Sequence, residues 1–147
     1  METFTPTRTP LPPSGTRVLQ LEAQSGLQVA QSLSRGLPTS SVERLADHLG
    51  VSVAQVLELA DLKNSTFFER KRKQQRLNPA ASERVYRLAK VFEAAEDYFQ
   101  DKAQVYTWLA QPKVALGGET PFAFARTAEG ADYVVKLLGR MAHGVIS

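Results

Sequence analysis

The stretch from Asn78-Pro79 to about Gln100 places the strongest constraint on what this chain can fold into, because no Gly or further Pro interrupts it. Asn is a favoured N-cap residue, and Pro is favoured at the first helical position. Apolar residues then recur at the three- and four-residue spacing of a helix with one buried face: Val85, Leu88, Phe92, Ala95 and Phe99. We therefore expect one long helix that joins two halves of the chain.

Short helices are expected before this long helix. Helical spacing predicts one that contains Leu27 and ends at Gly36. Two capping boxes, one at residues 40–43 (SSVE) and one at residues 52–55 (SVAQ), predict the starts of two more, and the first of these stops at Gly50. Asn64 and Ser65 are expected to cap a further helix that runs from residue 66 to about residue 75.

The C-terminal third has the same organisation. Asp101 and Thr127 are expected to cap helices, the second running to about His143, and Thr120-Pro121 opens a helical turn between them. Only the segment Val18–Leu21 is expected as a short strand. The chain is therefore predicted to be all-α, with a helix-turn-helix half joined by the long helix to a small helical half.

The basic residues are concentrated in one part of the chain. The net charge is only +3, yet residues 63–90 carry nine basic and two acidic side chains, whereas residues 1–62 and residues 91–147 each have a balance of −2. Such a block is typical either of a solvated helix face or of a surface that binds an anionic partner, for which nucleic acid is the sharper hypothesis.

Residues 53–72 match in part the packing of a helix-turn-helix, whose second helix enters the major groove of DNA. Asp61 stands in the turn, where Gly or a small residue is usual, and Asp tolerates the left-handed conformation. Two residues depart from the usual pattern, because Leu57 stands where Ala is common and Arg70 where an apolar residue is often buried. Four residues fall where the two helices must pack: Val56, Ala60, Leu62 and Phe67.

The second helix of this motif is the predicted DNA-binding site. Asn64 and Ser65 either bond base edges and phosphates or only cap the helix, and Phe68 contacts either a thymine methyl or a dimer partner. Six residues are expected to face outward: Lys63, Asn64, Ser65, Phe68, Glu69 and Arg72. Five are expected to contact phosphates without reading sequence: Arg70, Lys71, Arg72, Lys73 and Arg76.

Residues that could support catalysis or hold a metal are scarce. The chain has no Cys, which excludes disulfides, a thiol nucleophile and thiolate-bound metals. His48 and His143 lie far apart with no carboxylate at metal-ligand spacing, and His48 is expected to interact with the dipole at a helix C-terminus. Glu93, Glu96 and Asp97 are expected to form a solvated face. We predict that the chain is not an enzyme and has no cofactor and no metal.

The sequence shows no membrane segment. No stretch approaches the roughly 18 apolar residues of a spanning helix, and residues 1–13 lack the apolar core of a secretory signal. Residues 1–18 are rich in Pro and Thr and are expected to form a disordered arm, from which Arg8 and Arg17 could reach DNA phosphates. We expect a cytoplasmic protein, with a DNA-binding region at residues 19–80 and a connecting helix and second domain at residues 81–147.

Residues 101–147 carry more pattern than a helical core requires. In order, the landmarks are Trp108-Leu109, Pro112, Leu116-Gly117-Gly118, Thr120-Pro121-Phe122, Thr127, Gly130, Val134-Val135, Leu138 and Gly144. This segment resembles the C-terminal toxin-binding domain of the Xre/MbcA/ParS family of antitoxins, and residues 38–100 resemble the helix-turn-helix region of that family.

The resemblance implies an antitoxin of a type II toxin–antitoxin system. Its partner would be a RES-domain toxin that consumes NAD and is encoded beside it, and the antitoxin would act as a homodimer that binds its own promoter DNA. The resemblance places toxin-binding or supporting roles at Trp108, Leu116, Pro121, Phe122 and Tyr133. The C-terminal tail is expected to reach the entrance of the toxin active site: Arg140, His143, Gly144, Val145, Ile146 and Ser147.

The same landmarks also have a purely structural explanation. Trp108 can be a core residue, Gly117-Gly118 and Pro121 can simply form a turn, and Gly130 can allow close helix packing. Two other functions stay open at this point. One is a stand-alone transcriptional regulator whose C-terminal helices only dimerise, and the other is a helical adaptor whose basic helix binds an acidic protein.

Overall fold

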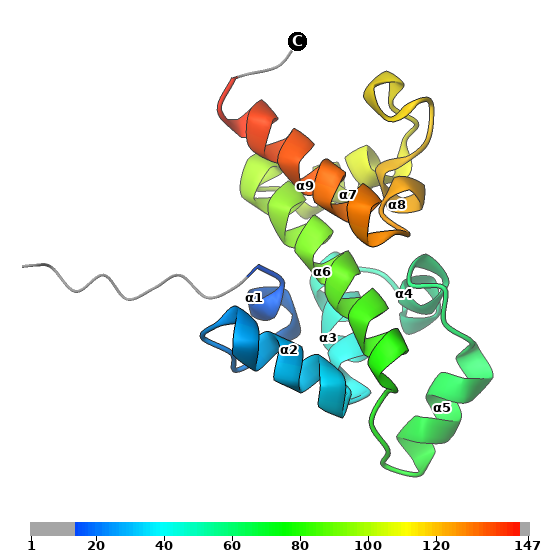
Figure 1. The fold of residues 1–147 in the computed structure, drawn as a ribbon. Helices are drawn as coiled ribbons and strands as arrows, with labels where there is room; N and C mark the ends of the chain where they lie inside the picture. The colour runs from blue at the N-terminus through cyan, green and yellow to red at the C-terminus, as the bar shows by residue number, and fades with distance from the viewer. Residues whose placement is uncertain (1–13, 145–147) are drawn as a thin grey trace, which may run out of the picture.

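The computed structural model describes residues 14–144, and within this range the chain forms helices and no strands (Figure 1). The expectation of an all-α fold is confirmed. In chain order the elements are α1 (Thr16–Leu19), α2 (Gly26–Arg35), α3 (Ser40–Leu49), α4 (Val53–Leu59), α5 (Asn64–Arg72), α6 (Pro79–Phe99), α7 (Lys102–Ala110), the 3-10 helix η1 (Val114–Leu116), α8 (Pro121–Phe124) and α9 (Ala128–Ala142).

Helix α6 is the element that both halves of the molecule share. It contacts α1, α2 and α3 from the preceding half and α7 and α9 from the following half, and in Figure 1 it runs through the centre of the fold. Because partners cover it on several sides, its buried stripe is wider than one helix face. Val85, Val91 and Phe92 are completely buried, and they belong to one continuous apolar core that spans both halves.

The predicted caps of the longer C-terminal helices are confirmed. The Asn78 side chain accepts a hydrogen bond from the backbone N–H of Ala81 at 2.7 Å, and Pro79 is the first residue of α6. Asp101 and Thr127 cap α7 and α9 in the same way. Each side chain satisfies a backbone donor that has no partner within its own helix.

The two capping boxes predicted near the N-terminus have different outcomes. The box at Ser52 and Gln55 is present, with both reciprocal hydrogen bonds formed. The box at Ser40 is wrong, because the N-cap of α3 is Thr39 and it makes no side-chain cap hydrogen bond. Thr39 already has helical backbone angles, and the carbonyls of Pro38 and Thr39 accept from the N–H groups of Ser41 and Val42, so Ser40 lies inside the helix.

The predicted strand at Val18–Leu21 is also wrong. This segment contributes to the single helical turn α1, which closes on itself through a hydrogen bond from the backbone N–H of Leu21 to the oxygen of Thr16. Val18 and Leu19 are both buried although they are neighbours, whereas a half-buried strand would bury alternate residues. Of the predicted N-terminal arm, residues 14–18 are described, and residues 1–13, including Arg8, lie outside the described range.

Gly36 lets two distant connections cross closely. A Cβ atom at this position would lie 2.0 Å from the backbone oxygen of Leu77, and the φ angle of 94° is one that side chains other than Gly rarely adopt. The N–H of Leu77 donates to the oxygen of Leu37 at 2.9 Å, and the N–H of Leu37 donates to Ser82 Oγ at 2.7 Å. The α2–α3 link is thereby fastened to the start of α6.

The acidic face predicted on α6 is solvated only in part, because Asp97 is exposed whereas Glu96 is half-buried and Glu93 is buried; the expectation is wrong for the last two. Glu93 is only 8% exposed, and one of its oxygens, Oε2, has no hydrogen-bond partner among the described residues. Glu96 bonds Arg17 at 3.1 Å and His48 Nε2 at 2.6 Å. Burial raises the pKa of the Glu93 carboxyl, and the positive charge of Arg17 opposes that rise. Glu93 and Glu96 are covered because α1 and α3 pack against α6.

Candidate functional site

The helix-turn-helix forms from α4, a short turn and α5. Asp61 adopts the expected left-handed conformation in the turn, with a φ angle of 56°. Three of the four residues predicted at the packing positions are buried, and Leu62 is half-buried; the buried three are Val56, Ala60 and Phe67. The sequence pattern therefore located this motif correctly.

The first turn of α5 differs from the prediction. Neither Asn64 nor Ser65 is its cap, because the N-cap position is Lys63, which makes no side-chain cap hydrogen bond. Asn64 and Ser65 lie inside the first turn, both are exposed, and within residues 14–144 their side chains make no hydrogen bond. Their donors and acceptors are consequently available to an external partner. Phe68 is 49% exposed and packs edge-on against Phe67.

The basic residues predicted to contact phosphate fall into two groups. Arg70 Nη1 donates to the backbone oxygen of Arg76 at 2.8 Å, and Arg76 Nη1 donates to the oxygen of Gly36 at 3.0 Å. These two arginines hold the connection from α5 to α6, which explains why Arg70 stands where an apolar residue is common.

The other basic side chains are less committed. Lys71 and Lys73 form ion pairs with Glu43 and Glu69, at 3.0 and 2.9 Å. The Lys73 pair lowers the pKa of Glu69, so this carboxyl stays ionised on the basic helix. Exposed pairs of this kind contribute little to stability, so a phosphate can replace the carboxylate. Two further cations, Lys63 and Arg72, form no hydrogen bond or ion pair with any described residue.

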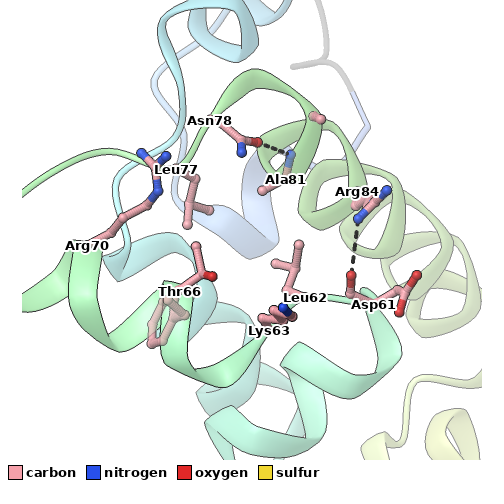
Figure 2. A pocket seen from close by; sticks show the side chains of 11 residues that line it. Asp61, Leu62, Lys63, Thr66, Arg70, Leu77, Asn78, Ala81 and Arg84 are labelled. Carbon is pink, nitrogen blue, oxygen red and sulfur yellow. Dashed lines mark hydrogen bonds between the residues drawn. The ribbon is translucent and has the colours of Figure 1, made fainter.

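A groove lies between the N-terminal part of α5 and the first turns of α6, with a volume of about 340 Å³. Figure 2 shows Thr66 and Leu62 on one side of it and Ala81 and Leu77 on the other. Arg84 lies at its edge, where Nη1 donates to the backbone oxygen of Asp61 at 3.1 Å. Sequence reasoning counted Arg84 in the basic window but gave it no role, because its position beside the turn depends on how α6 packs.

The residues predicted for toxin binding are not all on the surface. Tyr133 is 43% exposed, stacks edge-on against Phe124, and has the Arg140 guanidinium 5.7 Å from its ring centroid. Trp108 is half-buried, and its ring centroid lies 5.9 Å from the ring centroid of Phe99. Three of the predicted residues are buried and can only support such a surface: Leu116, Pro121 and Phe122.

The predicted tail is described only in part. Arg140, His143 and Gly144 are exposed at the end of α9. Val145, Ile146 and Ser147 lie outside the described residues. The structure therefore brings Tyr133 and Arg140 together on one helix and places the start of the tail just beyond them.

Sequence reasoning missed Val114, which is 98% exposed in a loop closed by a hydrogen bond from the N–H of Lys113 to the oxygen of Glu119 at 3.0 Å. Gly117 and Gly118 have positive φ angles and let the loop turn back on itself. The available signal was an apolar residue in the short segment between Lys113 and this Gly pair.

Comparison with known proteins assigns a family to each half of the chain. Residues 28–90 match the antitoxin Xre-like helix-turn-helix domain, and residues 94–144 match the antitoxin Xre/MbcA/ParS C-terminal toxin-binding domain. Antitoxin Xre of Yersinia enterocolitica is 32% identical over 145 residues, which cover 94% of this chain and 97% of that protein. The chain belongs to the Xre/MbcA/ParS family of antitoxins.

Other relatives agree with this assignment. The antitoxin is 27% identical over 148 residues to Antitoxin Xre of Photorhabdus laumondii, with both chains covered completely. It is also 27% identical over 124 residues to a protein of Sphingobium sp. named Prs ADP-ribosylating antitoxin, with 78% of each chain covered. This protein is thus an antitoxin of a toxin–antitoxin system, with a helix-turn-helix domain and a toxin-binding domain.

Two further observations concern the described part of the antitoxin. Within residues 14–144, no helix is both long enough and apolar enough to span a membrane. In the same range, no group of three or more His, Asp and Glu side chains is placed to hold a metal ion.

Proposed function

We propose that this antitoxin neutralises a RES-domain toxin that consumes NAD, and that it represses its own operon in the cytoplasm by binding promoter DNA as a homodimer. The observation that carries the proposal is the division of one chain between a DNA-binding family domain and a toxin-binding family domain. The resemblance of residues 101–147 supports the RES class. The name of the Sphingobium relative joins an antitoxin to ADP-ribosylation, a reaction that uses NAD as its donor.

The first turn of α5 supports the DNA-binding part of the proposal. In a helix-turn-helix, the N-terminal residues of the second helix contact base edges. Asn64 and Ser65 occupy that turn with uncommitted side chains, and an Asn amide can bond adenine bidentately. Lys63 and Arg72 stand at the two ends of the helix and supply charge for phosphates, as do the exposed lysines Lys71 and Lys73.

Phe68 supports the dimer. An aromatic ring that is 49% exposed on a helix otherwise rich in charge is unusual unless an apolar surface covers it. Helix-turn-helix proteins bind as dimers to two half-sites about one DNA turn apart, which requires such a contact between subunits. The competing role of Phe68 is contact with a thymine methyl. Phe68→Ala separates the two, because loss of dimerisation is visible by sedimentation without DNA.

The exposed pair on α9 supports the toxin-binding part. Tyr133 and Arg140 form a stacked aromatic–cation surface, and both residue types are enriched at the centres of protein interfaces. His143 and Gly144 continue from this surface into residues 145–147. Deletion of residues 144–147 is therefore expected to weaken neutralisation while DNA binding is kept. Full neutralisation by the truncated protein would refute the role of the tail.

The experiment that tests the whole proposal is purification of the tagged antitoxin from its native cells, with mass spectrometry of co-eluting proteins. We expect one small RES-type protein in stoichiometric amount, whose NAD-depleting activity is lost when the antitoxin is added. Recovery of the antitoxin alone as a DNA-binding dimer would instead favour a stand-alone regulator. If no toxin co-elutes and DNA binding does not depend on salt, the result would favour a helical adaptor that binds an acidic protein.

DNA binding has its own quantitative test. A dimer with about four phosphate contacts in each subunit, from Lys63, Lys71, Arg72 and Lys73, is expected to lose affinity with a slope near −7 in log K against log salt, from about 0.9 for each phosphate. The slope is measured by fluorescence anisotropy on a duplex from the promoter of the operon. A merely solvated basic face would give weak binding at every salt concentration.

A further inference from the structure

The groove between α5 and α6 has two chemically different parts. Its floor is apolar, because buried or half-buried side chains form it: Leu62, Phe67, Leu77 and Ala81. Its rim is polar and mainly cationic, with hydrogen-bond donors from five side chains: Lys63, Thr66, Arg70, Asn78 and Arg84. An apolar floor beneath a cationic rim suits a sugar ring with a phosphate attached to it, since the sugar can pack on carbon while the phosphate meets the charges.

The groove has a net positive charge, and some of its cationic side chains keep N–H donors that bond no described residue. Three cationic side chains line it against one carboxylate, that of Asp61. In Figure 2 the Asp61 carboxylate points outward, away from Thr66 and Ala81, while its backbone oxygen accepts from Arg84. Only Nη1 of Arg84 makes a hydrogen bond with a described residue, and a guanidinium has five N–H donors in total. Lys63 makes none.

The position of the groove indicates its occupant. It borders Lys63 and Thr66, at the end of α5 that faces base edges in a helix-turn-helix complex, so the DNA backbone that flanks those bases must pass nearby. Lys63, Thr66 and Arg84 are all exposed, which suits a continuous strand better than an enclosed small molecule. The groove is thus continuous with the DNA-binding helix and complementary in charge to duplex DNA.

We infer that the groove between α5 and α6 holds one phosphate of the DNA backbone, contacted by Lys63 from the start of α5 and by Arg84 from α6. This extends the DNA contact onto the helix that also carries the toxin-binding half. The inference rests on the proposed promoter binding. It adds Arg84, a residue outside the DNA-binding helix, to the phosphate contacts.

The test measures the salt dependence of binding for full-length variants on a promoter duplex and on an unrelated duplex of equal length. Lys63→Gln and Arg84→Gln are each expected to reduce the magnitude of the slope, and the double variant is expected to reduce it by about 1.8, from 0.9 for one phosphate in each of two subunits. The reduction is expected on both duplexes, because phosphate contacts do not read sequence. Lys102→Gln, which removes the same charge from an exposed position on α7, is the matched control and should leave the slope unchanged.

Arg84 also has a structural contact, so its role in DNA binding needs a separate control. Arg84→Lys keeps the charge but not the planar donors, and it is expected to keep the slope of the wild type, whereas Arg84→Gln is not. If both Gln variants keep the wild-type slope, the groove is not a phosphate site and the inference is wrong. If the wild type itself binds both duplexes weakly and without salt dependence, the proposed promoter binding fails instead. Binding of ADP that is lost in both Gln variants, with unchanged slopes, would make the groove a nucleotide site and overturn the inference.

Discussion

Gly130→Ala is expected to damage the packing of the last helix because of a single methyl group. Gly130 lies in the first turn of α9, and a Cβ atom there would lie 1.8 Å from the backbone oxygen of Phe124. The same atom would be 2.9 Å from the carbonyl carbon of Phe124 and from Thr127 Oγ1. Thr127 cannot easily move away, since its hydroxyl accepts the capping hydrogen bond from the Gly130 N–H.

Two opposing effects decide the size of the change. Replacing Gly by Ala inside a helix normally stabilises it by about 0.8–1.0 kcal/mol. Here the methyl would stand about 1.5 Å inside the closest ordinary carbon–oxygen approach of about 3.3 Å. The obstacle is backbone, so α9 would have to shift away from α8, and overpacking of this kind costs about 1–3 kcal/mol or more. We expect the clash to prevail, with a net loss of about 2 kcal/mol and a fall in Tm of roughly 4–8 °C.

Gly139→Ala is the matched control on the same helix. A Cβ atom at Gly139 would have no neighbour within 4 Å, so only the helix propensity changes, and the variant is expected to gain up to about 1 kcal/mol. Urea unfolding followed by circular dichroism measures both variants, and a toxin-binding assay shows whether a displaced α9 weakens the complex. The reasoning would be refuted if Gly130→Ala were as stable as the wild type, or if both variants lost the same free energy of unfolding.

Three further predictions concern stability and use the same unfolding assay. Ser52→Ala is expected to lower the free energy of unfolding by about 1 kcal/mol because it removes a formed capping box. Ser40→Ala, at a residue that forms no cap, should change it little, and equal losses in the two variants would contradict the assignment of the caps. Asp61→Val is expected to lower the free energy of unfolding by about 1–2 kcal/mol because the turn needs a residue in the left-handed conformation, while Asp61→Gly should be tolerated. A Val variant more stable than the Gly variant would refute this. Burial raises the pKa of Glu93 in the fold, so its protonated form contributes stability that is lost as pH rises through that raised pKa. Glu93→Gln should therefore gain stability relative to the wild type between acid and neutral pH, and a difference that is constant with pH would contradict it.

The helical segments could largely be predicted from the sequence because the signals that define them are local. The cap at Asn78, the Pro after it and the three- and four-residue spacing of apolar residues up to Phe99 all act within one helix. The left-handed residue Asp61 was predictable for the same reason, since its conformation depends on its own backbone. The family resemblance was also readable, because the order of landmark residues is itself a property of the sequence.

Errors arose where a neighbouring segment changed the outcome of a local signal. Ser40 has the right spacing for a capping box, but the helix begins one residue earlier than that box requires. Thr39 is the N-cap, and the carbonyls of Pro38 and Thr39 accept from the N–H groups of Ser41 and Val42. Val18–Leu21 has strand-like residues, but no described strand exists to pair with them, and α1 buries both Val18 and Leu19 against other helices.

The sequence by itself determined the helices, the helix-turn-helix motif and the family, because capping, periodicity and residue order depend on close neighbours in the chain. Only the tertiary structure decided which charged residues are available. Packing of α1 and α3 buries Glu93 and pairs Glu96, and the fold assigns Arg70 to a structural contact while it leaves Lys63 uncommitted. Burial and pairing depend on segments that are distant in sequence, and no local pattern encodes those distances.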